Sequence, residues 1–537
     1  MSKPKFTREE ALAFHLEPTP GKFEITATVP MTTQRDLSLA YSPGVAVPCE
    51  EIAQNPGLAY DYTNKGNLVA VISNGTAVLG LGNLGALGSK PVMEGKSVLF
   101  KRFADVNSID IELDTEDPDE FIKAVELMGP TFGGINLEDI KAPECFIIEQ
   151  TLKERMDIPV FHDDQHGTAV ICAAGLINAL HISGKKIEDC KIVLNGAGAA
   201  GIACIELLKA MGARHENCIV CDTKGVIYQG RTEGMNQWKS AHAVATELRT
   251  LDEAMKQADV FLGVSVKGAV TQDMVAAMAD NPVIFAMANP DPEITPEEAH
   301  EVRPDAIVAT GRSDYPNQVN NVLGFPYLFR GALDVHARAI NDEMKIACAE
   351  ALAELARADV PDEVAMAYGR KLAFGRDYII PTPFDPRLIH TVPPAVAKAC
   401  MNTGAARRPI VDMDAYEQTL AARMDPTASI LRSINARARN AQARMIFAEG
   451  DDPRVLRAAV QYQRSGLGKA IVVGRDDDVK AKLEAAGLGD AVRELEVTNA
   501  AKTDRLDDYK ELLYQRLQRK GHDRQDIHRM AARDRHV

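Results

Sequence analysis

The sequence has no excess of basic residues and no long basic run. Its 61 lysines and arginines stand against 76 aspartates and glutamates, which leaves a formal net charge of −15. A protein that binds nucleic acid needs a basic surface to neutralise phosphates. We therefore expect no nucleic-acid partner. Small anionic substrates stay compatible with this charge, because a bound metal can make a site locally positive.

Long apolar runs and a secretory signal are also missing. The longest apolar stretch, residues 168–180, is shorter than the roughly 20 residues of a membrane span, and no apolar segment follows the charged start. The nine cysteines are scattered and odd in number, which is typical of reduced thiols in the cytoplasm. Cys218 and Cys221 lie in an apolar, strand-like run and not at a helix start, so they do not indicate a redox pair. We expect a cytoplasmic protein without membrane contact.

The chain of 537 residues should form more than one domain, because single cores stop growing at about 250–300 residues. Residues 1–160 mix short strands with loops and helices. Strand and helix signals alternate over residues 161–400, which predicts a doubly wound parallel sheet. Residues 401–424 are predicted to be a linker, and residues 425–537 begin a second, partial α/β domain that ends in charged helix without a closing strand. The predicted fold class is α/β.

Two pairs of acidic residues are the most informative feature that is present. Asp163 and Asp164 are adjacent and follow an apolar segment, and Glu138 and Asp139 form a second pair upstream. Adjacent carboxylates repel each other, and a divalent cation removes the conflict by binding their oxygens. The pattern predicts a Mg²⁺ or Mn²⁺ site. Taken alone, the upstream pair is also compatible with a solvated helix start.

Other polar side chains near these acids have more than one interpretation. His162 and His166 have the i, i+4 spacing of a zinc pair, but the residues between them do not form a zinc-protease helix. Lys90 and Lys96 follow a glycine-rich loop, and a lysine that is partly desolvated near a metal can act as a base. Tyr41 lies in a loop where a phenol can face a cleft. Each of these lysines and the tyrosine is, alone, also compatible with an ordinary surface or packing role.

Two segments have the pattern Gly-x-Gly-x-x-Gly. Residues 80–85 have no long helical run behind them, so we expect no helix N-terminus there to hold a pyrophosphate. Residues 196–201 follow an apolar strand and open a helix, and Asp222 ends the next strand, near the distance of a ribose contact. The predicted dinucleotide site consists of Gly196, Ala197, Gly198, Ala199, Ala200, Gly201 and Asp222. The alternative is a tight turn that needs glycine only for packing.

Taken in order, these motifs resemble the malic enzyme family. The matching segments are residues 40–46, 80–85 with Lys96, 136–139, 161–168, the dinucleotide loop, 288–290 and 320–322. The run from residue 444 to residue 459 resembles the start of phosphate acetyltransferases. The whole is similar to bacterial hybrid malic enzymes, which carry such a domain after the catalytic part, although this chain ends well short of a complete one.

The resemblance implies a malic enzyme N-terminal domain followed by a Rossmann-type NAD(P)-binding domain. It also assigns roles to the polar residues. Glu138, Asp139 and Asp164 would bind Mg²⁺ or Mn²⁺. Lys96 would be the general base that takes the proton of the 2-hydroxyl of L-malate, and Tyr41 would be the general acid. The implied reaction is oxidation at C2 followed by decarboxylation of oxaloacetate, which gives pyruvate after protonation at C3.

Further residues receive roles from the same resemblance. Asp163 would orient the lysine, Asn289 and Asn321 would contact malate, and Asn289 and Asn320 would lie at the cofactor. The two histidines have no ligand role in this family pattern. Eukaryotic-type members carry an arginine before the first glycine loop that binds a substrate carboxylate, whereas residues 75–79 contain none.

The cofactor prediction weighs one residue against the family. Asp222 alone favours the 2′-hydroxyl of NAD and would repel a 2′-phosphate. Lys224 lies two residues further on and could offset that charge. Hybrid malic enzymes mostly use NADP, so we predict NADP, with NAD as the alternative.

Three interpretations of residues 425–537 follow. Acyl transfer is disfavoured, because about 110 residues are few for a domain that must bind coenzyme A and phosphate. A regulatory module that responds to an acetyl-CoA-type effector and an oligomerisation module are the other two. Enzymes of this size usually associate symmetrically, so we expect a homo-oligomer.

Overall fold

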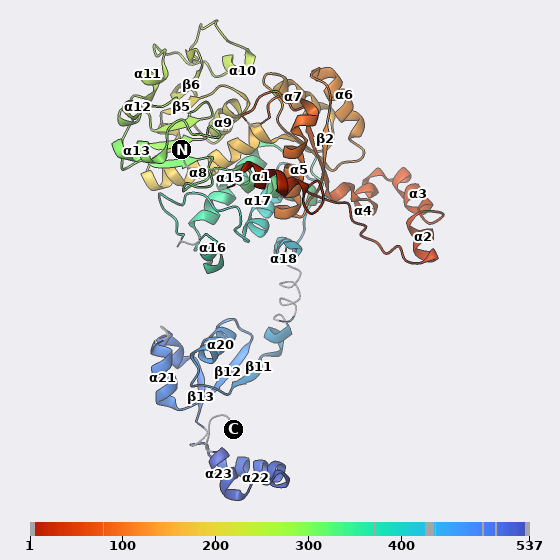
Figure 1. Ribbon diagram of the computed structural model, residues 1–537, viewed down its shortest axis with the longest axis vertical. Coiled ribbons are helices and arrows are strands. Elements are labelled where there is room, and N and C mark those ends of the chain that lie inside the picture. Colours follow the sequence, from red (N-terminus) through yellow and green to blue (C-terminus); the bar gives the residue numbers. More distant parts are fainter. Residues whose placement is uncertain are drawn as a thin grey trace. The chain divides into compact units, whose positions relative to one another are not determined.

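The computed structural model describes residues 6–78, 80–368, 372–424, 434, 437–485, 488–499 and 502–531 (Figure 1). The chain divides into two compact units, residues 1–424 and 425–537, called the first and the second unit below. Each unit contains its own parallel sheet or sheets. The α/β class predicted from the sequence is confirmed.

The first sheet of the first unit is parallel and has the strand order β2-β1-β3-β4. Its strands are β1 (Leu68–Ser73), β2 (Asn107–Glu112), β3 (Gly134–Leu137) and β4 (Val160–His162), and its helices are α5 (Gly85–Ala104), α6 (Pro118–Met128) and α7 (Glu144–Arg155). All residues of β1 and β3 are buried. The predicted domain boundary after residue 160 falls inside β4, which pairs with β3 and so belongs to this sheet.

Helix α5 corrects the interpretation of the first glycine pattern. A helix of 20 residues begins at Gly85, where the sequence predicted no long helical run. Pro91 lies inside α5, and a proline there removes a helix hydrogen bond and disfavours the helix. The helix nevertheless forms, because it buries Met93, Phe100 and Phe103 against the core. Burial of such side chains stabilises by about 1.5–3 kcal/mol each.

The second sheet has the strand order β10-β9-β8-β5-β6-β7, in which only β7 is antiparallel. Its strands are β5 (Ile192–Asn195), β6 (Cys218–Asp222), β7 (Gly225–Val226), β8 (Val260–Gly263), β9 (Val283–Ala286) and β10 (Ile307–Thr310). The strand order reverses around β5, which pairs with both β6 and β8. In doubly wound sheets ligands bind at the carboxyl ends of the strands beside this reversal. The predicted doubly wound sheet is therefore confirmed.

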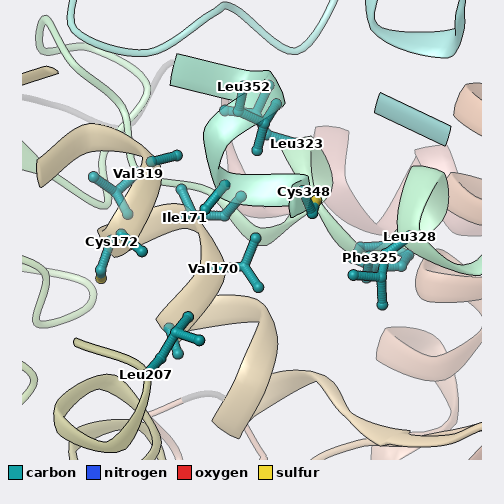
Figure 2. Close-up of a cluster of buried hydrophobic side chains, with 14 of the residues drawn as sticks. Val170, Ile171, Cys172, Leu207, Val319, Leu323, Phe325, Leu328, Cys348 and Leu352 are labelled. Atoms are coloured by element: carbon teal, nitrogen blue, oxygen red, sulfur yellow. The ribbon is translucent and has the colours of Figure 1, made fainter. Parts of the chain in front are cut away.

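The helices of this part surround the sheet and continue beyond it. They are α8 (Thr168–Ser183), α9 (Ala199–Ala210), α10 (Gln237–Ser240), α11 (Leu251–Met255), α12 (Gln272–Ala276), α13 (Pro296–Val302), α14 (Phe325–Asp334), α15 (Asp342–Arg357), α16 (Asp362–Ala367), α17 (Leu388–Asn402) and α18 (Met413–Met424). Figure 2 shows apolar side chains of α8, α14 and α15 packed together, with Leu207 of α9 beside them. This packing fixes α8 and α14 relative to each other. Asp163 and Asp164 lie in the turn directly before α8.

Helix α8 explains a second difference from the sequence expectation. With the π-helical turn before it (Asp163–Gly167), it forms a helix of 21 residues that is long and apolar enough to cross a membrane by length and composition alone. Of its most apolar window, 72% is buried inside the protein. Core helices pass the same test. The length and composition of this helix therefore do not indicate a membrane segment.

The first unit begins with an arm of short helices that buries little of itself. These are α1 (Arg8–Leu16), α2 (Gln34–Ala40), α3 (Ala46–Gln54) and α4 (Ala59–Tyr62), none of which contains a buried residue. Figure 1 shows α2 and α3 standing apart from both sheets of the unit. Leu39 and Val47 are 60% and 62% exposed.

The second unit has a parallel sheet with the order β11-β12-β13. Its elements are β11 (Ala443–Phe447), α20 (Pro453–Arg464), β12 (Gly468–Val473), α21 (Asp476–Ala485), β13 (Glu496–Thr498), α22 (Leu506–Leu517) and α23 (Arg524–Ala531). The sequence predicted β11, β12 and the terminal helices but not β13. That strand is only three residues long and its first residue is a glutamate, so it carries no apolar run that would indicate a strand.

Candidate active site

The carboxyl ends of two neighbouring parallel strands bring the predicted metal ligands together. Glu138 and Asp139 directly follow β3, and Asp164 follows β4, which pairs with β3. Their ligand atoms all lie within 4.8 Å of one another, and within the described ranges no other cluster of three histidine, cysteine or acidic residues has this geometry. The N–H of Asp139 donates to Oδ2 of Asp164 over 2.7 Å. Asp139 has φ 53°, a strained conformation of the kind that concentrates at functional sites.

The electrostatics of this cluster favour a bound cation. Burial raises the pKa of Glu138 well above its ordinary value, and the carboxylates of Asp164, Asp163 and Asp139 add to this against the opposing charge of Lys96. Asn136 fixes Glu138 by donating to its Oε2 over 2.9 Å. Three clustered carboxylates are the oxygen donors that Mg²⁺ and Mn²⁺ prefer. The donor set fits the predicted metal.

Lys96 projects from α5 into the same cluster. Its Nζ lies 2.5 Å from Oδ2 of Asp163 and 2.9 Å from Oε1 of Glu138, and only 10% of its side chain is exposed. The ammonium also lies over the ring of Phe325, 4.2 Å from the centroid, where a cation–π contact stabilises it. Burial alone would lower the pKa of Lys96, but Asp163 and Glu138 outweigh it and raise the pKa.

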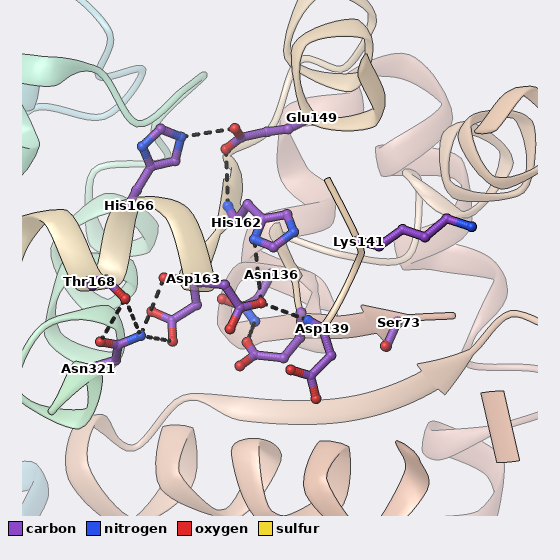
Figure 3. Close-up of polar contacts among 12 residues, drawn as sticks. Ser73, Asn136, Asp139, Lys141, Glu149, His162, Asp163, His166, Thr168 and Asn321 are labelled. Atoms are coloured by element: carbon purple, nitrogen blue, oxygen red, sulfur yellow. Dashed lines mark hydrogen bonds and ion pairs between the residues drawn. The ribbon is translucent and has the colours of Figure 1, made fainter. Parts of the chain in front are cut away.

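Asp163 holds the lysine and is itself held in place. Nδ2 of Asn321 donates to its Oδ2 over 3.0 Å, and Thr168 contacts the same amide at 3.4 Å, as Figure 3 shows. A Cβ at Gly167 would lie 1.9 Å from Oδ1 of Asp163, so a side chain at residue 167 would displace the carboxylate that holds the lysine. The acidic pair thus divides: Asp164 joins the carboxylate cluster of Glu138 and Asp139, and Asp163 binds Lys96.

Asn289 and Asn320 lie on loops after β9 and β10. A Cβ at Gly80 would meet the carbonyl oxygen of Asn289 at 3.2 Å, and a Cβ at Gly311 would meet its side chain at the same distance. Asn289 therefore lies between the first glycine loop and Gly311, and it lines an open groove with Lys267 and Arg312 among other residues. Oδ1 of Asn320 accepts a hydrogen bond from the N–H of residue 322 over 3.0 Å.

Glu293 supports this loop and was not found from the sequence. It is fully buried. Its carboxylate accepts hydrogen bonds from the N–H of Ser265 over 2.8 Å and the N–H of Ala288 over 3.0 Å. It therefore links the loops after β8 and β9 next to Asn289. A lone glutamate in a polar loop has no sequence signal for this role, because the contacts depend on sheet order.

The dinucleotide loop has the geometry that its glycines predict. Gly196 has φ 120°, and a Cβ there would lie 2.4 Å from the carbonyl oxygen of Val264. A Cβ at Gly201 would lie 1.9 Å from the carbonyl oxygen of Gly196. Gly198 precedes the first residue of α9, so the N-terminus of α9 opens at the end of β5. A helix N-terminus in this place is suited to a pyrophosphate.

Asp222 differs from the isolated acid that the sequence suggested. Nη2 of Arg231 lies 2.7 and 2.8 Å from its two carboxylate oxygens, and Nζ of Lys239 lies 2.7 Å from Oδ2. Despite burial, these cations lower the pKa of Asp222. Lys224 contributes only its backbone N–H, over 2.9 Å, because its ammonium pairs with Glu233. The sequence missed Arg231 and Lys239, which a loop and a short helix bring back to the strand end.

The two histidines belong to a buried network beside the carboxylate cluster, and Nδ1 of His162 lies 3.7 Å from Oδ2 of Asp164. Nε2 of His166 lies 2.9 Å from Oε2 of Glu149, and Oε1 of Glu149 accepts from the N–H of His162 over 3.0 Å (Figure 3). Lys153 lies 2.7 Å from Oε1 of the same glutamate. Burial lowers the pKa of His166 to about 4 despite Glu149. Both histidines are thus held by Glu149 next to the site, and the family pattern gives them no ligand role.

Two other candidates lie outside the cluster. Tyr41 caps the end of α2 and is 71% exposed, and Figure 1 shows α2 away from α5, the helix that carries Lys96. Within one copy of the chain, the structure does not bring Tyr41 to the site. Lys90 pairs with Asp110 at 2.6 Å and with Glu112 at 3.5 Å on strand β2, so it has a structural role.

Comparisons with known protein families match most of the chain. The family described as "Malic enzyme, N-terminal domain" matches residues 20–153, and "Malic enzyme, NAD binding domain" matches residues 165–368. "Phosphate acetyl/butaryl transferase" matches residues 429–537. The first match contains Lys96, Glu138 and Asp139, the second contains the dinucleotide loop, and Asp164 directly precedes the second.

Individual relatives agree with these matches. The "NADP-dependent malic enzyme" of Rhizobium meliloti is 63% identical over 530 residues, which are 98% of this chain and 70% of that protein. The enzyme of the same description from Escherichia coli is 55% identical over 96% of this chain and 68% of its own length. The crystal structure of a malic enzyme from Pyrococcus horikoshii has a TM-score of 0.73 and 42% identity, and the match covers 80% of this chain and 98% of that one.

Proposed function

The chain belongs to the malic enzyme family and catalyses the oxidative decarboxylation of malate, and we propose that it uses NADP and a divalent cation bound by Glu138, Asp139 and Asp164. The observation that carries this proposal is the placement of Lys96 against the carboxylate cluster, 2.9 Å from Glu138. When bound, Mg²⁺ or Mn²⁺ would supply Lewis-acid chemistry at the 2-hydroxyl and carboxylate of L-malate. Clustered carboxylates beside a buried lysine suit the chemistry of a chelating hydroxy acid.

The residues of the chain then carry the protons. Lys96, as the neutral amine that a bound cation would favour over the ammonium, accepts the proton of the 2-hydroxyl as hydride leaves C2 for the nicotinamide, which gives oxaloacetate. Asp163 stays the partner of Lys96 when Glu138 serves as a metal ligand, so the amine keeps its orientation. Loss of CO₂ from oxaloacetate leaves an enolate, and Tyr41 protonates its C3 to give pyruvate. Asn289 and Asn321 hold the substrate, and Asn320 lies at the cofactor.

NADP is supported by the two cations on Asp222. An isolated acid at this position binds the 2′-hydroxyl of NAD and repels a 2′-phosphate. Arg231 and Lys239 neutralise the acid and give the strand end a net positive charge of one among these three groups. Initial rates of pyruvate formation with NADP and with NAD, at saturating malate and Mg²⁺, test this proposal. Faster turnover with NAD contradicts the cofactor assignment, and absence of pyruvate with both contradicts the activity.

We also propose that the working form is a homo-oligomer in which Tyr41 of one copy completes the site of another. The arm that carries Tyr41 is exposed and rich in apolar side chains, and exposed apolar surface of this kind marks an interaction site. Mixing inactive Tyr41→Phe chains with inactive Lys96→Ala chains should restore activity, because mixed assemblies contain one intact site. Mixtures that stay inactive would show that Tyr41 does not act between copies.

The remaining proposals concern regulation and location. We propose that an acetyl-CoA-type effector acts through the second unit, which is supported by the match of residues 429–537 to phosphate acetyl/butaryl transferases. Initial rates with and without acetyl-CoA test this, and formation of acetyl phosphate would favour acyl transfer instead.

A cytoplasmic location is proposed from the nine cysteines, all of which are free.

A further inference from the structure

Helix α18 docks on the first unit through one face. Tyr416, Leu420 and Arg423 have the spacing i, i+4, i+7, which places them on the same side of a helix. Leu420 is fully buried, and the two polar residues flank it and reach different partners. This face belongs to none of the groups that bind substrate, metal or cofactor. The helix ends at Met424, where the first unit ends.

Tyr416 reaches helix α14. Its hydroxyl donates to Oδ2 of Asp334 over 2.7 Å. Burial and the Asp334 carboxylate raise the pKa of Tyr416, so the phenol stays a donor. Asp334 accepts two hydrogen bonds from the Arg330 guanidinium, from Nε over 2.9 Å to Oδ2 and from Nη2 to Oδ1. Arg330 is 1% exposed and also donates to Oδ1 of Asn67. A buried ion pair of this kind depends on each of its hydrogen-bond partners.

Arg423 reaches helix α5. Its Nη1 donates to Oδ2 of Asp105 over 3.1 Å, and Asp105 is the C-cap of α5 with φ 50°. The carbonyl oxygen of Asp105 accepts from Nδ2 of Asn67 over 3.0 Å. Asn67 therefore joins the two branches. The contacts of Tyr416 and Arg423 form one closed polar network across α18, α14 and α5.

The two helices that α18 holds are those that place the catalytic lysine. Helix α5 carries Lys96, and α14 supplies Phe325, whose ring lies under the ammonium. Phe100 of α5 packs edge-on against Phe325 at 4.8 Å and against Phe329 at 5.3 Å. Because the packing is tight, a shift of α5 relative to α14 moves the amine relative to its ring and to Asp163.

We propose that Tyr416 and Arg423 are positioning residues that set the place of Lys96 by fixing α5 against α14. The inference rests on the proposed function, since it assumes that Lys96 is the base in malate oxidation. A displacement of about 1 Å in a catalytic group can lower turnover about a hundredfold. The loss should be confined to the step that uses the lysine. Decarboxylation of added oxaloacetate does not require removal of the 2-hydroxyl proton, so it should be spared.

The test uses the full chain with Tyr416→Phe, Arg423→Gln and the double substitution. Thr419→Ala is the matched control, because Thr419 lies on the exposed side of α18 and bonds only to its own helix. We expect kcat for malate oxidation to fall about tenfold in the double variant. The KM for NADP and the rate of oxaloacetate decarboxylation should stay within about twofold of the control. Arg423→Lys should restore most of the loss of Arg423→Gln.

Each contrary outcome has a distinct meaning. Variants that oxidise malate as fast as the Thr419→Ala control overturn the inference while the proposed function stands. If both activities fall together and circular dichroism shows a lower unfolding midpoint, α18 has only a structural role and the positioning assignment is wrong. A wild-type chain that forms no pyruvate from malate overturns the proposed function and this inference with it.

Discussion

The six-stranded sheet of the first unit and the three-stranded sheet of the second are built from the same strand–helix units. They differ in how far their strands are buried by the rest of the protein. Strands β8 and β9 are buried at every residue. In contrast, four residues of β11 are exposed and the fifth is half-buried, with Ile446 63% exposed. The same local pattern therefore gives a closed core in one unit and an uncovered strand in the other.

This difference in strand burial decides where a cluster of charged catalytic side chains can form. In the first unit, buried strands end at an edge where carboxylates are forced together, and burial strengthens each electrostatic contact. The second unit also has acidic residues at helix starts, but their partners are exposed; Asp452, for example, caps α20 and pairs with Arg454 at 2.7 Å, whose side chain is 88% exposed. Among the described residues, the cluster of three potential metal ligands lies in the first unit.

Loss of one metal ligand should give the largest effect. Asp164→Asn removes one of the three clustered carboxylates, and several kcal/mol of transition-state stabilisation correspond to roughly a thousandfold loss of turnover. Malate-dependent NADP reduction over a Mg²⁺ titration measures this loss. Asp452→Asn in the second unit is the control and should leave turnover unchanged. Retention of metal-dependent activity in Asp164→Asn would show that the metal lies elsewhere.

A pair of matched truncations tests the difference in cover directly. Ile284→Ala in β9 creates a cavity in a closed core and should cost about 2–5 kcal/mol. Ile446→Ala in β11 removes the same atoms from an exposed position and should cost less than about 0.5 kcal/mol. Urea unfolding followed by circular dichroism measures both. A large cost at Ile446 would mean that β11 is covered in solution by another part of an assembly.

The sequence predicted the features that depend on local pattern. The strand before residues 196–201 and the helix after them indicated the glycine loop that opens α9, and the acidic residues indicated the carboxylate cluster. The features that failed depend on tertiary context. The sequence showed no long helical run after residues 80–85, and α5 forms there because its aromatic residues pack in the core. Lys239 reaches Asp222 across 17 positions, and no sequence period reports such a contact.

The position of Tyr41 shows a different limit. Its motif resembled the family, and its role was inferred from that resemblance. The fold of a single copy leaves it exposed on the arm, because local sequence does not say which copy of a chain a loop faces. The resemblance assigned Asp163 to the lysine and Asp164 to the metal, and in the structure Asp163 lies 2.5 Å from Lys96 while Asp164 lies with Glu138 and Asp139.

A single lysine in each unit can be compared in the same way, starting with Lys239, one of the two cations that bind Asp222. Lys239→Ala should raise the KM for NADP about tenfold, the equivalent of about 1.4 kcal/mol, and should leave the KM for NAD nearly unchanged. Lys469 is the counterpart in the second unit, since it pairs with Glu496 at 2.7 Å on an open sheet. Lys469→Ala should change neither constant. Equal changes for both cofactors in Lys239→Ala would show that Lys239 stabilises the loop without recognising the 2′-phosphate.

The edge strands of the two units should differ in the sign of a small pH effect. On β2, burial and the hydrogen bond with Asp110 raise the pKa of Glu112 to about 7. The folded state thus holds this proton more tightly than the unfolded state, so its contribution to stability is lost as pH rises from about 4.5 to about 7. Glu112→Gln removes this loss and should stabilise the chain by about 1 kcal/mol at pH 8, allowing for solvent screening.

At pH 4 the same Glu112→Gln substitution should have little effect, because the carboxyl is then largely protonated in both states. Glu496 on β13 is the contrasting case, since the hydrogen bond and charge of Lys469 lower its pKa. Its contribution is present above the unfolded pKa and is lost as pH falls, so Glu496→Gln should be slightly destabilising at pH 8. Urea midpoints at pH 4 and pH 8 measure both variants. If both substitutions shifted the urea midpoint in the same direction at pH 8, the two glutamates would not differ in how their charge affects stability.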